Sequence, residues 1–216
     1  MIRLIIADDH PLVREGVKKV FETSKKLNVS VSAEASDAKE LFEILEKQHP
    51  PDVILLDINM PGKNGLDILK DLQQKYHQIP VLMLSMHPAE RFAVRSLKAG
   101  ASGYITKESI PDQIEKAVDM VVNKKKKYIS EEVAEKLAEA VDEKSGHLRH
   151  MELSDREYQV MMMIAEGKKT KEIADELSLS VRTVLTYRKR MMEKLKLDTN
   201  VEIANYAIRH HLVENT

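Results

Sequence analysis

Two uninterrupted apolar runs end in acidic residues: Val53–Leu56 leads into Asp57, and Leu4–Ala7 leads into the pair Asp8 and Asp9. Parallel strands that are buried on both faces of a sheet read as continuous Val/Ile/Leu runs of this kind. In open α/β sheets, ligands bind outside the carboxyl ends of the strands. We therefore expect a parallel sheet with three carboxylates crowded along one edge.

Three neighbouring carboxylates repel one another unless a cation offsets their charge. A hard divalent ion with oxygen ligands is the natural candidate. The sequence thus predicts a Mg²⁺ pocket in which Asp57 is free to act as a nucleophile.

As far as about residue 123, short β-rich runs alternate with helical patterns, which gives five βα repeats. Segments such as 38–46 and 66–72 space their apolar residues three and four apart, as helices packed on a sheet do. Right-handed crossovers then predict a doubly wound, five-stranded parallel α/β sheet. The expected strands are 4–8, 29–33, 53–57, 81–85 and 103–106.

The βα pattern ends at the lysine run 124–127, which we interpret as a solvated helix end rather than a DNA-binding tail. Ser130 is expected to cap a short helix that runs to about Asp142, and residues 143–150 to form a flexible link. From Leu153 onward the pattern indicates four helices and no strand. Two of them, near 171–177 and 181–196, have the spacing of a helix-turn-helix.

The second half of the chain contains several residues that typically begin or end helices. Ser154 with Glu157 and Thr199 with Glu202 have the spacing of capping boxes, Gly167 fits a C-terminal stop, and Thr170 and Ser180 are expected caps.

The chain has 216 residues, 43% of them hydrophobic, which suits two ordinary domains with real cores. The absence of cysteine excludes disulfides and thiolate metal sites. Since we find neither a secretory signal nor a membrane-spanning apolar run, we expect a soluble cytoplasmic protein without a membrane partner.

Two further polar residues stand at ends of the expected strands: Ser85 closes the fourth, and Lys107 follows the fifth. A carboxylate that attacks a phosphoryl donor forms an acyl phosphate, and the protein supplies positioning and charge neutralisation. Lys107 can provide an ammonium, and the Ser85 hydroxyl can donate to a new phosphoryl oxygen. Tyr104 is placed to follow a movement of Ser85.

These residues closely resemble the receiver domain of bacterial two-component response regulators. The resemblance covers about residues 1–123 and rests on Asp8-Asp9, Asp57, Met60-Pro61-Gly62, Ser85, Ala99-Gly100-Ala101, Tyr104 and Lys107. It implies a flavodoxin-like sheet of order 2-1-3-4-5. It also implies that Asp9, Asp57 and the backbone carbonyl of Asn59 bind Mg²⁺ while Asp8 acts through water.

By the same resemblance, Asp57 takes a phosphoryl group from a sensor histidine kinase, and Ser85, Tyr104 and Lys107 relay the change. We further hypothesise that Asn59, Met86 and His87 help to set the lifetime of the phosphoryl group.

The segment 181–196 reads as a basic helix, with six Lys and Arg residues against the single acid Glu193, a net charge of +5. Val184, Met191, Met192 and Leu195 can form its buried stripe, which leaves another face free to enter a major groove of double-stranded DNA. The candidate DNA contacts are Arg182, Thr183, Leu185, Thr186, Arg188, Lys189 and Arg190.

The second half resembles the LuxR-type DNA-binding domain over about residues 151–212. The matching motifs are Leu153–Glu157, Ile164–Gly167, Lys171–Ala174, Leu177–Ser180, Thr183-Val184 and Lys194-Leu195. The two resemblances together point to the NarL/FixJ class of response regulator. They imply a receiver at 1–123, a linker with a short helix at 124–150 and a helix-turn-helix domain at 151–216.

This chain departs from the family at Leu185 and Tyr187, where lysine and histidine are usual, so its sequence preference is expected to differ. Lys189 matches a position that the family uses on DNA. The outer surface of the last helix, 201–211, is expected to pair two domains when the protein is phosphorylated. A contact with RNA polymerase is expected as well.

Two other functions stay open at this point. A Mg²⁺-dependent phosphatase or phosphotransferase also uses a strand-end aspartate, but it resembles Asp-x-Asp, and Asn59 cannot shuttle a proton. A binding module that works without phosphorylation is the other alternative. Intact Asp8, Asp9, Asp57 and Lys107 argue against that module, so we expect a regulator rather than a turnover enzyme.

Overall fold

The computed structural model describes residues 1–24, 26–86, 89–142, 149–210 and 212–213. They form two compact units, Met1–Val141 and Asp142–Thr216. The expected link at 143–150 falls largely outside the described residues, because residues 143–148 are not described.

The first unit is built on a five-stranded parallel sheet of order β2-β1-β3-β4-β5, which confirms the predicted fold class. Every residue of β3 and β4 is buried, as their continuous apolar sequences predict. The strands are β1 (Ile2–Ala7), β2 (Val29–Ala35), β3 (Val53–Asp57), β4 (Val81–Ser85) and β5 (Gly103–Thr106).

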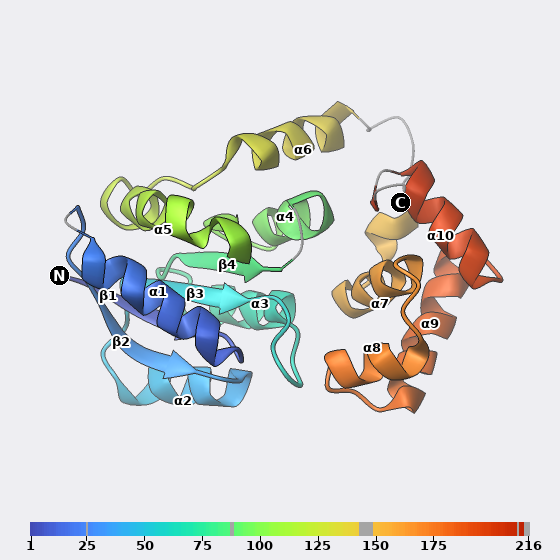
Figure 1. Ribbon diagram of the computed structural model, residues 1–216, viewed down its shortest axis with the longest axis horizontal. Coiled ribbons are helices and arrows are strands. Elements are labelled where there is room, and N and C mark those ends of the chain that lie inside the picture. The colour runs from blue at the N-terminus through green and yellow to red at the C-terminus, as the bar shows by residue number, and fades with distance from the viewer. Residues whose placement is uncertain (25, 87–88, 143–148, 211, 214–216) are drawn as a thin grey trace. The chain divides into compact units, whose positions relative to one another are not determined.

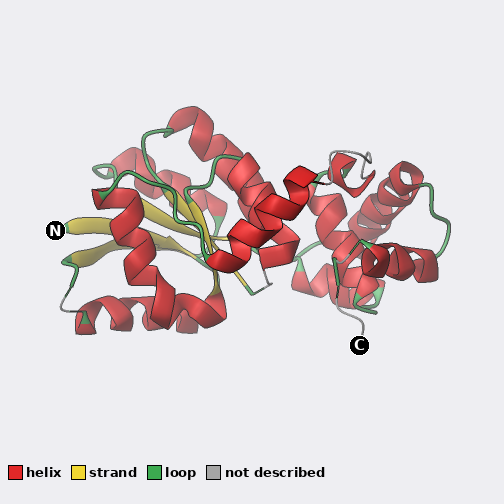
Figure 2. Cartoon of the chain, turned by 90° about the horizontal axis from the view of Figure 1, so that it is seen from above, coloured by secondary structure: helices red, strands yellow, loops and turns green. Residues whose placement is uncertain are grey.

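Helices cover both faces of this sheet (Figures 1 and 2). They bury apolar stripes against the strands: Val17 and Phe21 of α1, with Ile114 and Val118 of α5, join one core with the β1 and β3 side chains. The helices are α1 (Pro11–Thr23), α2 (Ala38–Lys47), α3 (Gly65–Lys75), α4 (Ala89–Lys98), α5 (Ile110–Val118) and α6 (Glu131–Asp142), with short helical turns η1 (Lys107–Ser109) and η2 (Asp119–Asn123).

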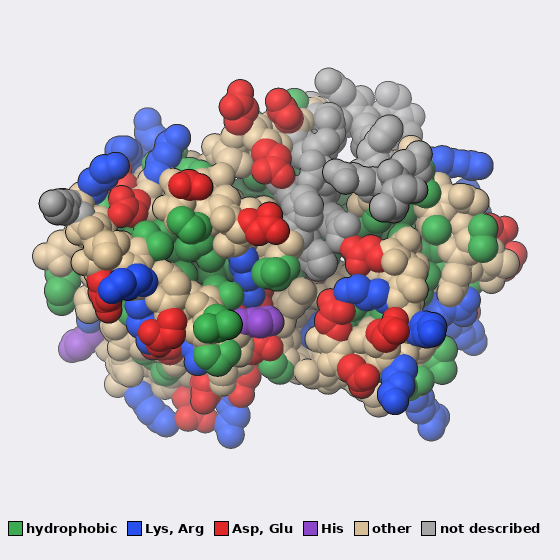
Figure 3. All heavy atoms as spheres, viewed as in Figure 1, with side chains coloured by type: hydrophobic (Ala, Val, Ile, Leu, Met, Phe, Trp, Pro, Cys, Tyr) green, Lys and Arg blue, Asp and Glu red, His purple; other side chains and the backbone are tan. Residues whose placement is uncertain are grey.

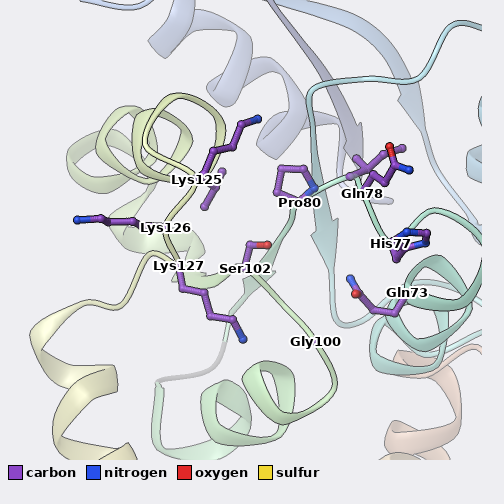
Figure 4. A pocket seen from close by; sticks show the side chains of 11 residues that line it. Gln73, His77, Gln78, Pro80, Gly100, Ser102, Lys125, Lys126 and Lys127 are labelled. Carbon is purple, nitrogen blue, oxygen red and sulfur yellow. The ribbon is translucent and has the colours of Figure 1, made fainter.

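The lysine run follows η2 and is exposed, as the sequence predicts. Its loop is held to the sheet because the backbone N–H of Tyr128 donates to the Ser102 carbonyl at 2.8 Å. Lys125, Lys126 and Lys127 line a hollow of about 300 Å³, and Lys126 extends away from Ser102 (Figure 4).

The second unit contains η4 (Arg149–Glu152), α7 (Asp155–Ala165), α8 (Thr170–Glu176), α9 (Val181–Leu195) and α10 (Asn200–Arg209). The predicted capping boxes at Ser154 and Thr199 are both present, and Gly167 takes the left-handed conformation, with φ 84°.

Acidic and basic side chains are interspersed on the surface displayed in Figure 3, in keeping with a net charge of −1.

One predicted cap is wrong. Thr170 is the first residue of α8, and Lys169 stands at the N-cap. The reason is local: the Glu172 carboxylate, three residues after Lys169, turns back and accepts a hydrogen bond from the backbone N–H of Lys169 at 2.7 Å, which fixes Lys169 as the N-cap residue. Ser180 does cap α9, because its hydroxyl accepts from the backbone N–H of Thr183 at 3.0 Å.

Candidate functional site

The acidic residues and Lys107 meet at the carboxyl edge of the sheet. Asp8 directly follows β1, Asp57 ends β3, and Lys107 directly follows β5. The Lys107 Nζ lies 2.8 Å from Asp8 Oδ2 and 3.0 Å from Asp57 Oδ2. The three side chains predicted from strand ends therefore form one contiguous charged cluster.

The turn after β3 requires glycine at Gly65, the first residue of α3. A Cβ atom there would lie 2.2 Å from the backbone oxygen of Asp57. The Gly65 N–H donates to the Ile58 carbonyl at 2.9 Å, and Asn64 caps the helix. This close approach of α3 fixes the backbone that carries Asp57.

Asp57 is held in a desolvated setting, with only 1% of its surface exposed. Burial raises the pKa of Asp57 to about 6; the Lys107 ammonium opposes that rise, and the Asp8 carboxylate adds to it. Its carboxylate still carries the negative charge at neutral pH, as a nucleophile must.

The site offers a donor set that fits a divalent cation. Ligand atoms of Asp8, Asp9, His10 and Asp57 all lie within 4.8 Å of one another. Both carboxylate oxygens of Asp57 are buried, and the Lys107 ammonium lies beside one of them. Oxygen-rich sites of this kind suit Mg²⁺. Asn59 lies two residues beyond β3, in the loop that leads to α3.

Sequence reasoning missed His10. Its Nδ1 lies 3.1 Å from Asp8 Oδ1 and 2.7 Å from Asp9 Oδ1. The signal was available, because His10 directly follows the acidic pair and precedes Pro11, the first residue of α1.

Arg14 was also missed. Its Nη1 donates to the backbone oxygen of Asp8 at 2.8 Å, and its Nε donates to Glu34 Oε2 at 2.7 Å. Hydrogen bonds from Lys18 and Arg14 lower the pKa of Glu34, which keeps this carboxylate charged. Arg14 thereby ties β2 to the end of β1 and helps to fix the position of Asp8.

The remaining receiver candidates occupy the neighbouring strand ends. Ser85 is buried at the end of β4, opposite Thr106 of β5. Tyr104 is buried within β5, where it pairs with Met83. Met86 is 58% exposed directly after β4, whereas His87 lies outside the described residues.

The basic helix α9 has the two faces that its sequence predicts. Val184, Met191, Met192 and Leu195 are all buried. The opposite face carries a shallow groove lined by Arg182, Leu185, Thr186, Lys189, Arg190 and Glu193. These residues recur three and four apart, so they form one continuous stripe along the helix.

Two of the predicted DNA contacts lie outside this groove. Arg188 donates from Nε and Nη2 to Asn200 Oδ1 at 3.0 and 2.8 Å, which ties α9 to the start of α10. Thr183 lies at the helix start, where its hydroxyl is 2.7 Å from that of Ser180.

Comparison with known families adds to this geometry. Residues 4–119 match the family described as the response regulator receiver domain, and this match alone covers more than half of the chain. The chain belongs to the response regulators. Residues 151–207 of this response regulator match a second family, the bacterial regulatory proteins of the luxR family. The pair of domains defines the NarL/FixJ class, whose members are phosphorylation-controlled, DNA-binding transcription regulators.

Relatives match the response regulator over nearly its whole length. It is 33% identical to the response regulator UvrY of Escherichia coli strain K12 over 213 residues, 98% of this chain and 96% of that protein. It is 35% identical to the response regulator GacA of Pseudomonas aeruginosa over 215 residues, 99% of each chain.

A solved structure with the same two-domain content is similar as well. RcsB from Salmonella enterica serovar Typhimurium, bound to promoter rprA in the presence of phosphomimetic BeF3⁻, has a TM-score of 0.64 and 27% identity, covering 95% of this chain and 97% of that one. Among the described helices of our response regulator, none combines the length and apolarity needed to cross a bilayer.

Proposed function

We propose that Asp57 is the phosphoacceptor of this response regulator and that Asp8, Asp9, Asp57 and the backbone carbonyl of Asn59 hold Mg²⁺. The observation that carries the proposal is the buried, charged Asp57 carboxylate with Lys107 Nζ at 3.0 Å. When bound, Mg²⁺ supplies positive charge that offsets the carboxylates and the transferred phosphoryl group.

The chain's own groups account for the transfer. A carboxylate oxygen of Asp57 attacks the phosphorus of a phosphohistidine on a sensor kinase; the new O–P bond forms as the P–N bond breaks, and the imidazole leaves. The Lys107 ammonium, already beside Asp57, pairs with a phosphoryl oxygen. The Ser85 hydroxyl donates to another phosphoryl oxygen.

We assign the relay to Ser85 and Tyr104, and the tuning of phosphoryl lifetime to Asn59, Met86 and His87. A movement of Ser85 toward the phosphoryl group would change the packing around Tyr104, because Ser85 and Tyr104 lie on the adjacent, paired strands β4 and β5. The exposed Met86 side chain directly follows Ser85, where it can limit the approach of water.

The DNA-reading surface in this proposal is the exposed stripe of α9. Arg182, Thr186, Lys189 and Arg190 supply hydrogen-bond donors, and Leu185, 48% exposed, offers an apolar contact for a thymine methyl. RcsB, which is similar to this chain, has been solved bound to promoter DNA, and this supports a DNA-binding role for the protein as a whole. Thr183 and Arg188 flank the stripe and contact the phosphate backbone, which positions the helix without reading sequence.

The functional boundaries that we propose are a receiver at 1–123, a linker at 124–150 and a DNA-binding domain at 151–216. Phosphorylation of the receiver favours a homodimer that reads two half-sites, and the dimer contacts RNA polymerase. The protein acts in the cytoplasm and is not a turnover enzyme.

The test is intact-mass measurement of the protein after incubation with acetyl phosphate and Mg²⁺, beside Asp57→Asn. We expect one added phosphoryl group on the wild type and none on the variant. An unmodified wild type, or equal modification of both, would overturn the proposal. Rapid turnover of unrelated phosphate esters would favour the phosphatase alternative instead.

A further inference from the structure

His10 stands at the mouth of the acidic pocket and approaches it from the side opposite Lys107. The Lys107 ammonium contacts Oδ2 of Asp8, whereas His10 Nδ1 lies 3.1 Å from Oδ1 of the same carboxylate. The same Nδ1 is 2.7 Å from Asp9 Oδ1, and the His10 side chain is 56% exposed. One ring nitrogen thus faces two oxygens of the proposed metal site.

These separations are those of imidazole–carboxylate hydrogen bonds, and they also match the spacing of neighbouring ligands around one ion. Ligands at about 2.1 Å from a six-coordinate metal lie roughly 3 Å apart when adjacent and roughly 4.2 Å apart when opposite. The Nδ1 to oxygen distances of 3.1 and 2.7 Å fit adjacent positions, and the whole set with Asp57 lies within 4.8 Å. His10 therefore reaches the pocket without rearrangement of the backbone.

The backbone holds His10 in this place. Its N–H donates to Asp8 Oδ1 at 2.9 Å, and Pro11 begins α1 immediately after it. When the ring proton is on Nε2, the Nδ1 lone pair points at the carboxylates and can bind a metal.

We propose that His10 is an additional ligand of the pocket and that its nitrogen makes the site selective for borderline first-row ions such as Co²⁺ and Ni²⁺ over Mg²⁺. This inference rests on the proposed metal site of Asp8, Asp9 and Asp57. An imidazole suits such ions, whereas Mg²⁺ prefers oxygen donors and keeps several waters. The pocket then responds to two classes of divalent ion through different ligand sets.

The test compares Co²⁺ and Mg²⁺ affinities by calorimetry for the wild type, His10→Ala and His77→Ala. His77 is an exposed histidine that the carboxylate pocket does not include, so its variant controls for surface binding. Mutation of residues that only orient the metal ligands typically lowers metal affinity 10–100-fold. Loss of His10 as a ligand should therefore lower the Co²⁺ affinity at least tenfold. Mg²⁺ affinity should change by less than about twofold, as expected for an ion that favours oxygen donors.

Direct ligation has its own readout in proton NMR of the Co²⁺-loaded protein. A hyperfine-shifted, exchangeable imidazole N–H signal is expected in the wild type and His77→Ala, and it should vanish in His10→Ala. The role of His10 would be overturned by any of three results for His10→Ala: an equal loss of affinity for both ions, an unchanged Co²⁺ affinity, or a shifted N–H signal that persists. Failure of the wild type to bind either ion would instead overturn the metal pocket itself, and the inference with it.

Discussion

Replacing Asp57 with asparagine should stabilise the metal-free protein at neutral pH, although it abolishes the phosphoacceptor. Asparagine keeps the size of the side chain and removes its charge. In the folded protein the pKa of Asp57 is raised from 3.8 to about 6, chiefly by burial, so the charged form is less favourable there than in the unfolded chain.

The sign and size follow from proton linkage. Between pH 4 and pH 6 the folded state binds more protons than the unfolded state, so this group makes stability fall as the pH rises through that window. At pH 7 the rise from 3.8 to about 6 corresponds to about 3 kcal/mol of destabilisation, at 1.36 kcal/mol for each pH unit. The free energy of unfolding of Asp57→Asn at pH 7 should therefore exceed that of the wild type by about this amount.

The assay is urea unfolding of both proteins in the presence of a chelator, at pH 7 and at pH 4, following the transition of the receiver. The variant should be the more stable at pH 7 and close to the wild type at pH 4. Saturating Mg²⁺ should raise the stability of the wild type and leave the variant nearly unchanged. A variant that is less stable than the wild type at pH 7 in chelator would refute the reasoning.

Three further predictions concern other parts of the molecule. Lys107→Met leaves two buried carboxylates without their cation, so the free energy of unfolding in chelator should fall by about 3–5 kcal/mol; an unchanged urea midpoint would contradict the ion pairs. Gly65→Ala should lower the free energy of unfolding by about 3 kcal/mol, because the new Cβ clashes with the backbone. Gly16→Ala should raise it by about 0.5–1 kcal/mol, because a Cβ there meets nothing within 4 Å and alanine suits the interior of α1 better. Similar unfolding curves for the two variants would contradict this prediction. Lys189→Ala should weaken binding to a selected duplex more than to an unrelated duplex, as measured by fluorescence anisotropy, because Lys189 lies in the proposed base-reading stripe; equal weakening of both duplexes would remove Lys189 from that role.

The sheet and its acidic edge were predictable because they depend on long apolar runs. β3 and β4 read as strands by their composition alone, and parallel strands must gather their carboxyl ends at one edge. The sequence alone therefore places Asp8, Asp57 and Lys107 together. The buried stripe of α9 was predictable for a similar reason, since its period of 3.6 residues runs over four turns.

The errors and omissions lie where a contact depends on tertiary geometry or on competing local bonds. At Thr170, a hydroxyl residue near the expected helix start predicts a cap, but the hydrogen bond from the Lys169 N–H to Glu172 fixes the N-cap one residue earlier. Arg14 reaches Asp8 only because α1 packs beside β2, a relation that no short motif records. The bonds from Arg188 to Asn200 could not be read from the sequence, because they depend on the packing of α9 against the start of α10.

The central claim is that phosphorylation at Asp57 controls the DNA-binding surface of α9. It is tested most directly by selecting binding sites from genomic DNA and then measuring the affinity of one selected duplex for the full-length protein, with and without acetyl phosphate and Mg²⁺. We predict that phosphorylation tightens binding by about tenfold or more in the wild type, a coupling typical of linked sites, and leaves Asp57→Asn unchanged. Equal affinities of phosphorylated and unphosphorylated wild type, or the same gain in Asp57→Asn, would contradict the account.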